Sequence, residues 1–239
     1  MNLMLIREEE MEGEVAVVRG RRARHVVEVL GKGVGDGVRI GWLNGPRGEG
    51  EVLRVEGEEV WLRCRWREEG RERPQLDVIL AAPRPKVMKR LWAQLAALGV
   101  GRIDVIRTWK VERSYVECHA MGREVYEPLL IEGLEQAQDT WLPVVEVHKR
   151  FRPFVEDVVP GRYGEHVKWL ADVGERRWPG EEERGSGQRQ VVAIGPEGGW
   201  TEEEREMLRG VGFERVSLGE RSLRSDTATV LLVGALGVR

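Results

Sequence analysis

The feature that most constrains the fold begins after Pro74. From there, short apolar segments typical of buried strands alternate with segments whose apolar residues have the spacing of a helix. Residues 76–82 read Leu-Asp-Val-Ile-Leu-Ala-Ala, an almost continuous apolar segment that predicts a buried strand. Residues 87–98 place apolar side chains at helical intervals and end at a glycine, and residues 103–106 form a second apolar strand. A strand, a helix and a strand in this order make the unit of a parallel sheet. We therefore predict an α/β fold.

The remainder of the C-terminal half continues this alternation. Residues 191–195 are the most clearly buried strand, and the helix predicted after them has Thr201 as N-cap, with Glu204 completing a capping box. A last helix over 226–236 is expected to be capped by Asp226. The further elements that we predict are helices over 125–137 and 151–158, strands over 144–147, 167–173 and 216–218, and an exposed loop over 174–188.

The N-terminal third has a different pattern. Residues 38–42, 50–55 and 60–66 alternate polar and apolar side chains, which is typical of half-buried strands. Turn residues separate them at 44–46 and 56–58, and a short helix is predicted over 22–30. The pattern favours a small β-barrel that ends at the charged linker 67–73. We expect two domains, residues 1–72 and residues 73–239.

Composition limits the classes of function. The net charge of −3 in 239 residues means that any surface for RNA must be a local basic patch. Two distant cysteines and four scattered histidines show no metal-ligand spacing, so no metal is predicted. The sequence has no apolar segment of the roughly 20 residues that a membrane span needs. We expect a cytoplasmic protein that does not enter a membrane.

Two glycine-bearing turns are the candidate site. The first, residues 195–201, reads Gly-Pro-Glu-Gly-Gly-Trp-Thr and joins a buried strand to a helix N-terminus. Glycines permit close approach of a ligand to the backbone, and ligands of open α/β sheets bind at the carboxyl ends of strands. The turn matches neither the dinucleotide-binding fingerprint nor the P-loop. Taken alone, it is equally compatible with a mere tight connection.

The second turn, residues 218–228, reads Leu-Gly-Glu-Arg-Ser-Leu-Arg-Ser-Asp-Thr-Ala and again leads into a helix. Two such turns about twenty residues apart could hold one ligand. In the alternative interpretation, Leu223 only fills the core and Arg224 is a surface charge.

The two motifs, in this order and spacing, resemble the signature of the ribosomal RNA small-subunit methyltransferase E family. This family belongs to the SPOUT superfamily and methylates N3 of a uridine in 16S ribosomal RNA. Most of the chain supports the resemblance, through segments that resemble the family's PUA-like barrel (24–30 and 34–40) and its middle section (98–103, 112–114 and 135–136).

The resemblance implies a C-terminal trefoil knot that holds S-adenosyl-L-methionine, with the active site at a homodimer interface. The cofactor-binding positions that match the motifs are Gly195, Glu197, Gly198, Gly199, Leu218, Gly219, Leu223, Arg224 and Thr227. For catalysis we favour Arg224, which would stabilise the developing uracil anion, and Glu197, which would accept a proton or hold the cofactor's amino group.

The RNA-facing residues match the family less closely. Gln94, Ala97 and Asp139 stand where the family usually has Lys, Glu and Arg. Arg21, Arg22, Arg24 and His25 are a candidate RNA-contacting cluster, or else a solvated helix face. Of the nine tryptophans we expect most in the core, with Trp200 as the candidate for stacking on a base.

Two alternatives to this function remain. The first is a methyltransferase of the same superfamily that acts on transfer RNA or on another ribosomal site. The second is a non-catalytic RNA-binding factor for ribosome assembly, against which the intact cofactor motifs argue.

Overall fold

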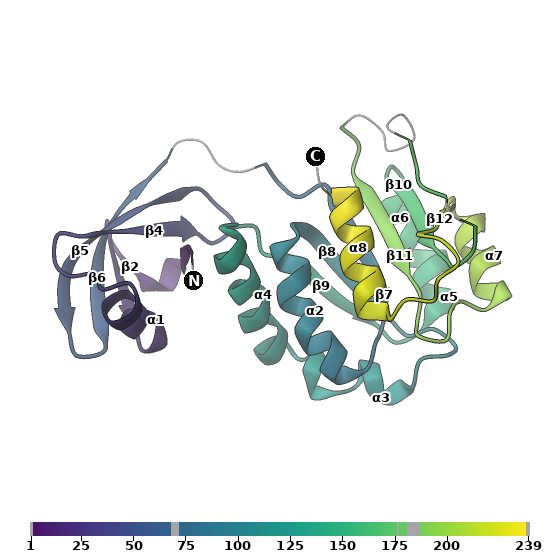
Figure 1. Cartoon of the computed structure of the whole chain (residues 1–239), viewed down its shortest axis with the longest axis horizontal. Coiled ribbons are helices and arrows are strands. Elements are labelled where there is room, and N and C mark those ends of the chain that lie inside the picture. Colours follow the sequence, from purple (N-terminus) through teal and green to yellow (C-terminus); the bar gives the residue numbers. More distant parts are fainter. Residues whose placement is uncertain (1, 68–71, 176, 181–186, 238–239) are drawn as a thin grey trace. The chain divides into compact units, whose positions relative to one another are not determined.

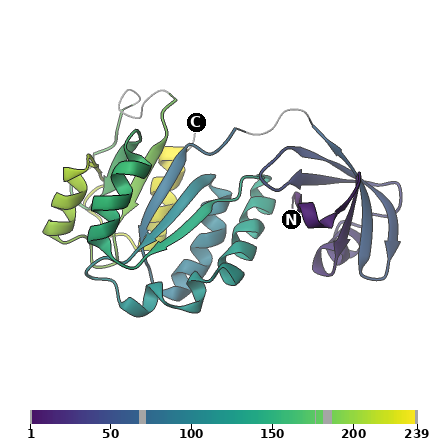
Figure 2. The ribbon, with the colours of Figure 1, turned by 180° about the vertical axis from the view of Figure 1, so that it is seen from behind.

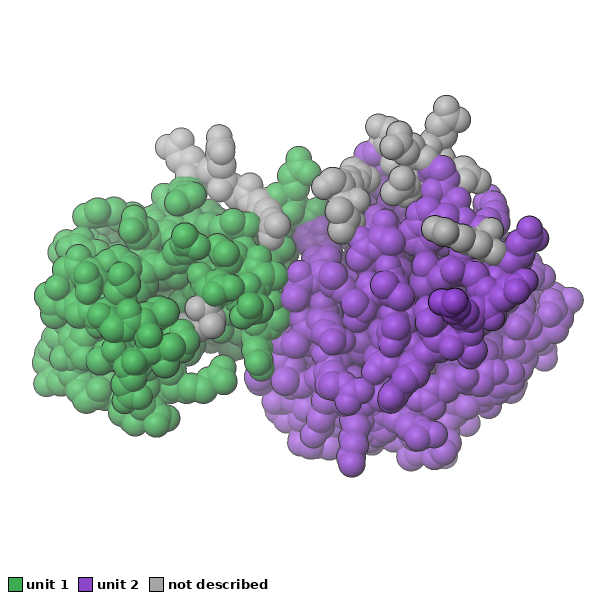
Figure 3. Space-filling model, in the orientation of Figure 1, with its two compact units in different colours: residues 1–73, 131–142 green, residues 74–130, 143–239 purple. Residues whose placement is uncertain are grey.

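The computed structural model describes residues 2–67, 72–175, 177–180 and 187–237. The chain forms two compact units (Figure 3): unit 1 holds residues 1–73 and 131–142, and unit 2 holds residues 74–130 and 143–239. The predicted linker 67–73 and loop 174–188 each lie partly outside the described residues.

Unit 2 is built on a six-stranded sheet in which every described pairing is parallel, in the order β12-β10-β11-β7-β8-β9 (Figure 1). The predicted α/β fold is therefore confirmed. The central strands β7 and β11 are buried along their whole lengths, as their apolar sequences predict. The strands are β7 (Leu76–Ala81), β8 (Val100–Ile106), β9 (Val144–His148), β10 (Val167–Ala171), β11 (Gln190–Ile194) and β12 (Glu214–Val216).

Helices cover both faces of this sheet. Helices α2 (Pro85–Ala97) and α8 (Ser225–Gly237) contact each other and lie on one face, while α6 (Val159–Tyr163) lies on the other (Figures 1 and 2). The buried side chains of α2 recur at helical spacing, which fixes the face that it turns to the sheet. The other helical segments of the second half are α3 (Arg113–Val116), η3 (His119–Met121), α4 (Arg123–Ala137), α5 (Phe151–Pro153), η4 (Phe154–Val158) and α7 (Glu202–Gly210).

The two helices that follow the candidate turns begin differently from one another. Helix α7 starts as predicted, with Thr201 accepting from the N–H of Glu204 and the Glu204 side chain accepting from the N–H of Thr201. Helix α8 begins at Ser225, so the prediction that Asp226 is the N-cap is wrong. Asp226 lies in the first turn, where a carboxylate still interacts favourably with the helix dipole.

Unit 1 contains a curled, mixed sheet in the order β1-β4-β5-β6-β3-β2. Of the pairings described in this sheet, that of β1 with β4 is parallel and the others are antiparallel. The three predicted strands are confirmed as β4 (Gly37–Trp42), β5 (Arg47–Glu56) and β6 (Glu59–Trp66), and the predicted helix as α1 (Arg21–Arg24) followed by the wider-turned η2 (His25–Val29). The elements not predicted are β1 (Met4–Ile6), η1 (Glu8–Glu10), β2 (Met11–Glu12) and β3 (Val15–Arg19).

The core of unit 1 explains why these short elements form. One apolar cluster, formed with the inner side chains of the longer strands, buries Met4 and Ile6 of β1, Ala16 and Val18 of β3, and Val26 of η2.

Among the described residues, no helix combines the length and the apolar character needed to cross a membrane.

Candidate functional site

The two glycine-bearing turns meet at one cavity of about 410 Å³ in unit 2. The cavity lies at the carboxyl edge of the parallel sheet, where β10, β11 and β12 end. Its described lining comes from the end of β10 (Ala171, Asp172, Val173), the first turn (Ile194, Gly195, Pro196, Glu197, Gly198, Gly199, Trp200), α7 (Arg205), the second turn (Val216, Leu218, Gly219, Arg221, Ser222, Leu223) and α8 (Ser225, Ala228, Leu232).

Most of the predicted cofactor-binding residues lie together around this cavity: Gly195, Glu197, Gly198, Gly199, Leu218, Gly219 and Leu223. Arg224 and Thr227 are not among its lining residues, although both chain neighbours of Arg224 are. The expectation that two turns distant by about twenty residues enclose one space therefore agrees with the geometry.

The conformation of the first turn depends on its glycines and on Trp200. A side chain at Gly195 would place its Cβ 2.8 Å from Nε1 of Trp200, so only glycine fits there. Gly199 has a φ of +66° and donates its N–H to the carbonyl of Pro196 at 2.8 Å. The Trp200 indole is buried and donates to the carbonyl of Ala171 at 2.9 Å. Trp200 thus joins the turn to the end of β10 and cannot stack on a base.

The second turn is held by Ser217. Gly219, with a φ of +123°, donates its N–H to Oγ of Ser217 at 3.1 Å. The same hydroxyl lies 3.0 Å from the carbonyl of Gly174, to which it donates. This buried serine connects the second turn to the segment that follows β10, so the ends of β10 and β12 are joined beside the cavity.

Charged groups surround the cavity opening. Arg205 donates to the Asp172 carboxylate at 2.7 Å, and Glu197 pairs with Arg84 at 3.2 Å while its side chain remains 41% exposed. The Arg224 side chain is 78% exposed, and its Nε lies 3.8 Å from Asp226. A hydrogen bond from Arg90 lowers the pKa of Asp226, so this carboxylate stays ionised beside Arg224.

Several lining residues were missed by the sequence analysis, most clearly Asp172 and Val173. The available signal was their place at the end of the predicted strand 167–173, since the ends of neighbouring parallel strands share one edge of the sheet. Arg221 and Ser222 also line the cavity, but they lie at variable positions of the second motif, between Gly219 and Leu223.

The predicted RNA cluster lines a separate cavity of about 400 Å³ in unit 1. Arg21, Arg22, Arg24 and His25 surround it together with Glu28, Val29, Glu132, Glu135 and Gln136. Arg22 is committed to an ion pair with Glu10 and to the carbonyl of Leu5, whereas Arg21 and Arg24 are exposed. Among the described residues, Nε2 of the half-buried His25 has no hydrogen-bond partner. Of the two exposed arginines, Arg24 also lies 3.6 Å from Glu58.

The departures in the middle section have separate structural positions. Gln94 and Ala97 are exposed on α2. Asp139 is buried, and its Oδ1 accepts from the N–H groups of Thr140 at 2.7 Å and Trp141 at 3.2 Å. An arginine could not accept these two bonds, so aspartate at 139 has a local structural role in the turn after α4.

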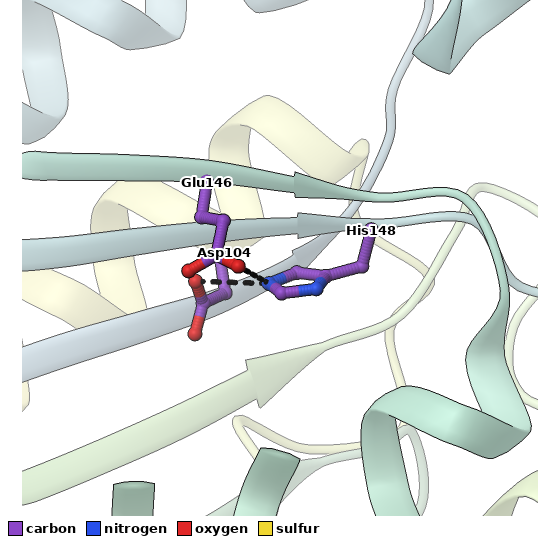
Figure 4. A group of neighbouring side chains, drawn as sticks. All are labelled: Asp104, Glu146 and His148. Atoms are coloured by element: carbon purple, nitrogen blue, oxygen red, sulfur yellow. Dashed lines mark hydrogen bonds and ion pairs between the residues drawn. The ribbon is translucent and has the colours of Figure 1, made fainter. Parts of the chain in front are cut away.

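One further group has the arrangement of metal ligands. Asp104, Glu146 and His148 project toward one another from neighbouring strands (Figure 4), with single ligand atoms within 4.8 Å. Arg162, however, binds both oxygens of Asp104 at 2.9 Å and donates to Glu146 at 2.7 Å. Because this guanidinium already neutralises the two carboxylates, we interpret the group as a partly buried ion-pair network.

The electrostatics of this network centre on Asp104. Burial acts to raise the pKa of Asp104, but hydrogen bonds from His148, Tyr163 and Arg162 outweigh it and hold the pKa below its usual range. Burial, reinforced by the charge of Asp104, raises the pKa of Tyr163, which donates its hydroxyl to Asp104 at 2.6 Å. The network therefore fixes α6 against β8 and β9.

Comparison with known proteins places this geometry among RNA-modifying enzymes. Residues 71–237 match the model of the RNA methyltransferase domain family. The chain is 31% identical over 233 residues to ribosomal RNA small subunit methyltransferase E of Treponema pallidum (strain Nichols), covering 95% of this chain and 87% of that protein. It is 26% identical to the enzyme of the same name from Bacillus subtilis (strain 168), covering 97% and 93% of the two chains.

Solved structures share the fold over the whole chain. A ribosomal RNA small subunit methyltransferase E from Neisseria gonorrhoeae, bound to S-adenosyl methionine, superposes with a TM-score of 0.80 at 21% identity, covering 99% of this chain and 96% of that one. A probable rRNA-methyltransferase from Porphyromonas gingivalis superposes with a TM-score of 0.77 at 22% identity, covering 99% and 98%.

Proposed function

Because the chain belongs to the ribosomal RNA small subunit methyltransferase E family, we propose that it transfers a methyl group from S-adenosyl-L-methionine to N3 of a uridine in 16S ribosomal RNA. The observation that carries the proposal is the cavity where both glycine-bearing turns meet at the carboxyl edge of the sheet. The names of the relatives given above indicate the type of reaction, and the cavity is the site that we propose for it.

The cavity residues fit this cofactor. A volume of about 410 Å³ is within the range of small-molecule sites. Leu218, Leu223 and Leu232 offer apolar surface for a flat ring, while Asp172 and Glu197 offer carboxylates for an amino group. Gly199 and Gly219 have no atoms within 4 Å of the position of an added Cβ, so a ligand can approach their backbone. When bound, the cofactor supplies an electrophilic methyl group.

The protein's own chemical task is to make N3 of uracil nucleophilic, because this nitrogen is protonated at neutral pH. We assign Arg224 to stabilising the developing negative charge on the base. Its exposed guanidinium projects from a segment whose neighbours, Leu223 and Ser225, both line the cavity. Glu197 is assigned to accepting the proton or to holding the cofactor's amino group, and its half-exposed carboxylate suits either role.

We assign RNA binding outside the reaction centre to the cluster of Arg21, Arg22, Arg24 and His25. Arg21 and Arg24 are the members whose exposed side chains can reach phosphates, since Arg22 is held by Glu10. Residues 1–72 then act as the RNA-binding domain and residues 73–239 as the methyltransferase domain, in keeping with the family match from residue 71.

The C-terminal segment is proposed to form the trefoil knot of the SPOUT superfamily. Strand β12 pairs with β10 at the edge of the sheet, and the chain then returns in α8 to contact the central strands β7 and β11. We also propose a cytoplasmic homodimer. The half-exposed Leu231 of α8, close to the lining residues Ala228 and Leu232, is a candidate contact between the subunits.

Two measurements test the proposed function. Titration calorimetry with S-adenosyl-L-methionine is expected to show saturable binding, and a non-catalytic RNA-binding factor would show none. Mass spectrometry of ribosomal RNA from a strain that lacks the gene is expected to show loss of one 3-methyluridine from 16S RNA. Unchanged 16S RNA with a methyl group missing from transfer RNA or another ribosomal site would contradict the proposed substrate.

A further inference from the structure

Trp109 is a large aromatic side chain left half exposed next to the proposed reaction centre. It lies in the loop after β8, at the carboxyl edge of the parallel sheet, and 50% of it is accessible to solvent. Its neighbours Thr108 and Val111 are buried, so the loop is anchored at both sides of the exposed pair Trp109 and Lys110.

The loop that carries this indole is attached by hydrogen bonds to the first glycine turn and to α7. The backbone N–H of Trp109 donates to Oε1 of Glu204 at 2.7 Å, and Oε2 of the same buried carboxylate accepts from the backbone N–H of Thr201 at 2.7 Å. The ammonium group of Lys110 donates to the carbonyl of Gly198 at 2.7 Å. Since Gly198 lines the cavity, the exposed pair lies directly beside it.

Aromatic packing supports one side of the ring. Trp109 packs against Phe151 with ring centroids 5.2 Å apart, and Phe151 packs against Trp200 at 6.2 Å. Phe151 and Trp200 are both buried, so the indole rests on a rigid base and retains an accessible surface. A ring held in this way loses little conformational freedom when a flat ligand stacks on it.

We infer that Trp109 is the platform on which an unpaired base of the acceptor RNA stacks at the reaction centre. This inference rests on the proposed function and names a positioning residue for it. Enzymes that modify bases must take the base out of its stack, and a tryptophan replaces the lost stacking. Lys110 uses one of its three donors on Gly198, which leaves its charge available to the phosphate of the same nucleotide.

The test compares Trp109→Ala, Trp109→Phe and Trp109→Leu in the full-length chain, with Val144→Ala as control. Val144 is similarly exposed, at 51%, but it is the first residue of β9 and so lies at the amino ends of the parallel strands, away from the cavity. The alanine variant is expected to raise KM for RNA about fivefold to a hundredfold, since stacking of one base contributes that much to affinity. The Kd for the cofactor and the melting temperature are expected to remain near those of the wild type.

The phenylalanine variant is expected to restore most of the RNA affinity and the leucine variant is not. Equal rescue by leucine would overturn the inference and indicate simple apolar packing. An unchanged KM in the alanine variant would also overturn it, because the side chain would then make no contribution to RNA binding. RNA affinity is also measured by filter binding with S-adenosylhomocysteine. If the wild type binds RNA but transfers no methyl group, the proposed function fails, and the same comparison of variants still decides the role of Trp109.

Discussion

Glu204 is completely buried, and its carboxylate accepts a hydrogen bond from the backbone N–H of Trp109, which lies 95 residues earlier in the chain. Its second oxygen accepts from the N–H of Thr201 and so caps α7. The Glu204 side chain therefore caps the start of α7 and also attaches the loop that follows β8 to this helix. The cavity and this loop are parts of one hydrogen-bonded structure.

Glu204→Gln is expected to lower the free energy of unfolding by about 1–3 kcal/mol, because the amide retains one acceptor oxygen for two backbone donors. Urea denaturation measures the change. Glu203→Gln, on the same turn but 58% exposed, is the matched control and should change stability by less than about 0.5 kcal/mol. Equal effects of the two substitutions would show that the link to Trp109 contributes nothing.

Gly199→Ala is expected to weaken binding of S-adenosyl-L-methionine at least tenfold, because the methyl group occupies backbone surface that the ligand approaches. Gly57→Ala is a close control, since Gly57 has a φ of +57° against +66° at Gly199, and nothing lies within 4 Å of the place that a Cβ would take at either residue. Both variants should lose about 1 kcal/mol of stability from backbone strain. Calorimetry separates the two effects, and equal Kd values would argue against the turn as a cofactor cradle.

Arg224→Ala is expected to lower kcat about a hundredfold while Kd for the cofactor stays within twofold, because the guanidinium acts on charge that develops in the transition state. Arg209→Ala on α7, 49% exposed, should leave both quantities unchanged. A parallel loss of cofactor binding and turnover would instead assign Arg224 to cofactor capture or to folding.

Asp104→Asn is expected to destabilise unit 2 by about 3 kcal/mol, because Arg162 then loses its buried partner. The pKa of Asp104 is below its usual range in the folded protein, so its contribution is present above the ordinary aspartate pKa of about 3.9. The contribution is lost as the pH falls through the folded-state pKa. The difference in unfolding free energy between the two proteins should therefore stay constant from pH 7 down to about pH 4 and shrink only at lower pH. Asp157→Asn, at an exposed position, should remain parallel to the wild type.

Replacing Arg21 and Arg24 together by alanine is expected to weaken RNA binding and to reduce the slope of log K against log salt concentration by about 1–2. Arg65→Ala on β6, 72% exposed, is the control and should leave the slope unchanged. Filter binding between 50 and 200 mM salt, concentrations at which phosphate contacts dominate, gives both slopes. An unaltered slope in the double variant would remove this cluster from the RNA surface.

The sequence predicted those features that depend on residues close together in the chain. The Thr201–Glu204 capping box is a three-residue relationship, and the apolar segment at 191–194 is recognisable without its neighbours. Strand β1 was missed because a three-residue element has no period, and its burial comes from the parallel pairing with β4.

The side chains of the site were harder to place. Trp200 follows the glycine turn and was expected to meet a base, but its indole bonds to Ala171 on a strand that no local pattern connects to it. Trp109 was overlooked for the same reason, because its exposure depends on Phe151 and its position on Glu204. Contacts over such separations depend on the order of strands in the sheet, which residue spacing does not encode.

That order also governs when the protein can assemble during its synthesis. Strand β7 pairs on one side with β11, more than a hundred residues later, and the described pairings of β10 are with β11 and β12. A nascent chain that has emerged from the ribosome only as far as β10 therefore holds the three-stranded fragment β7-β8-β9 and an unpaired β10. Strand β11, residues 190–194, pairs with both, so the sheet of unit 2 becomes continuous only after these residues have been translated.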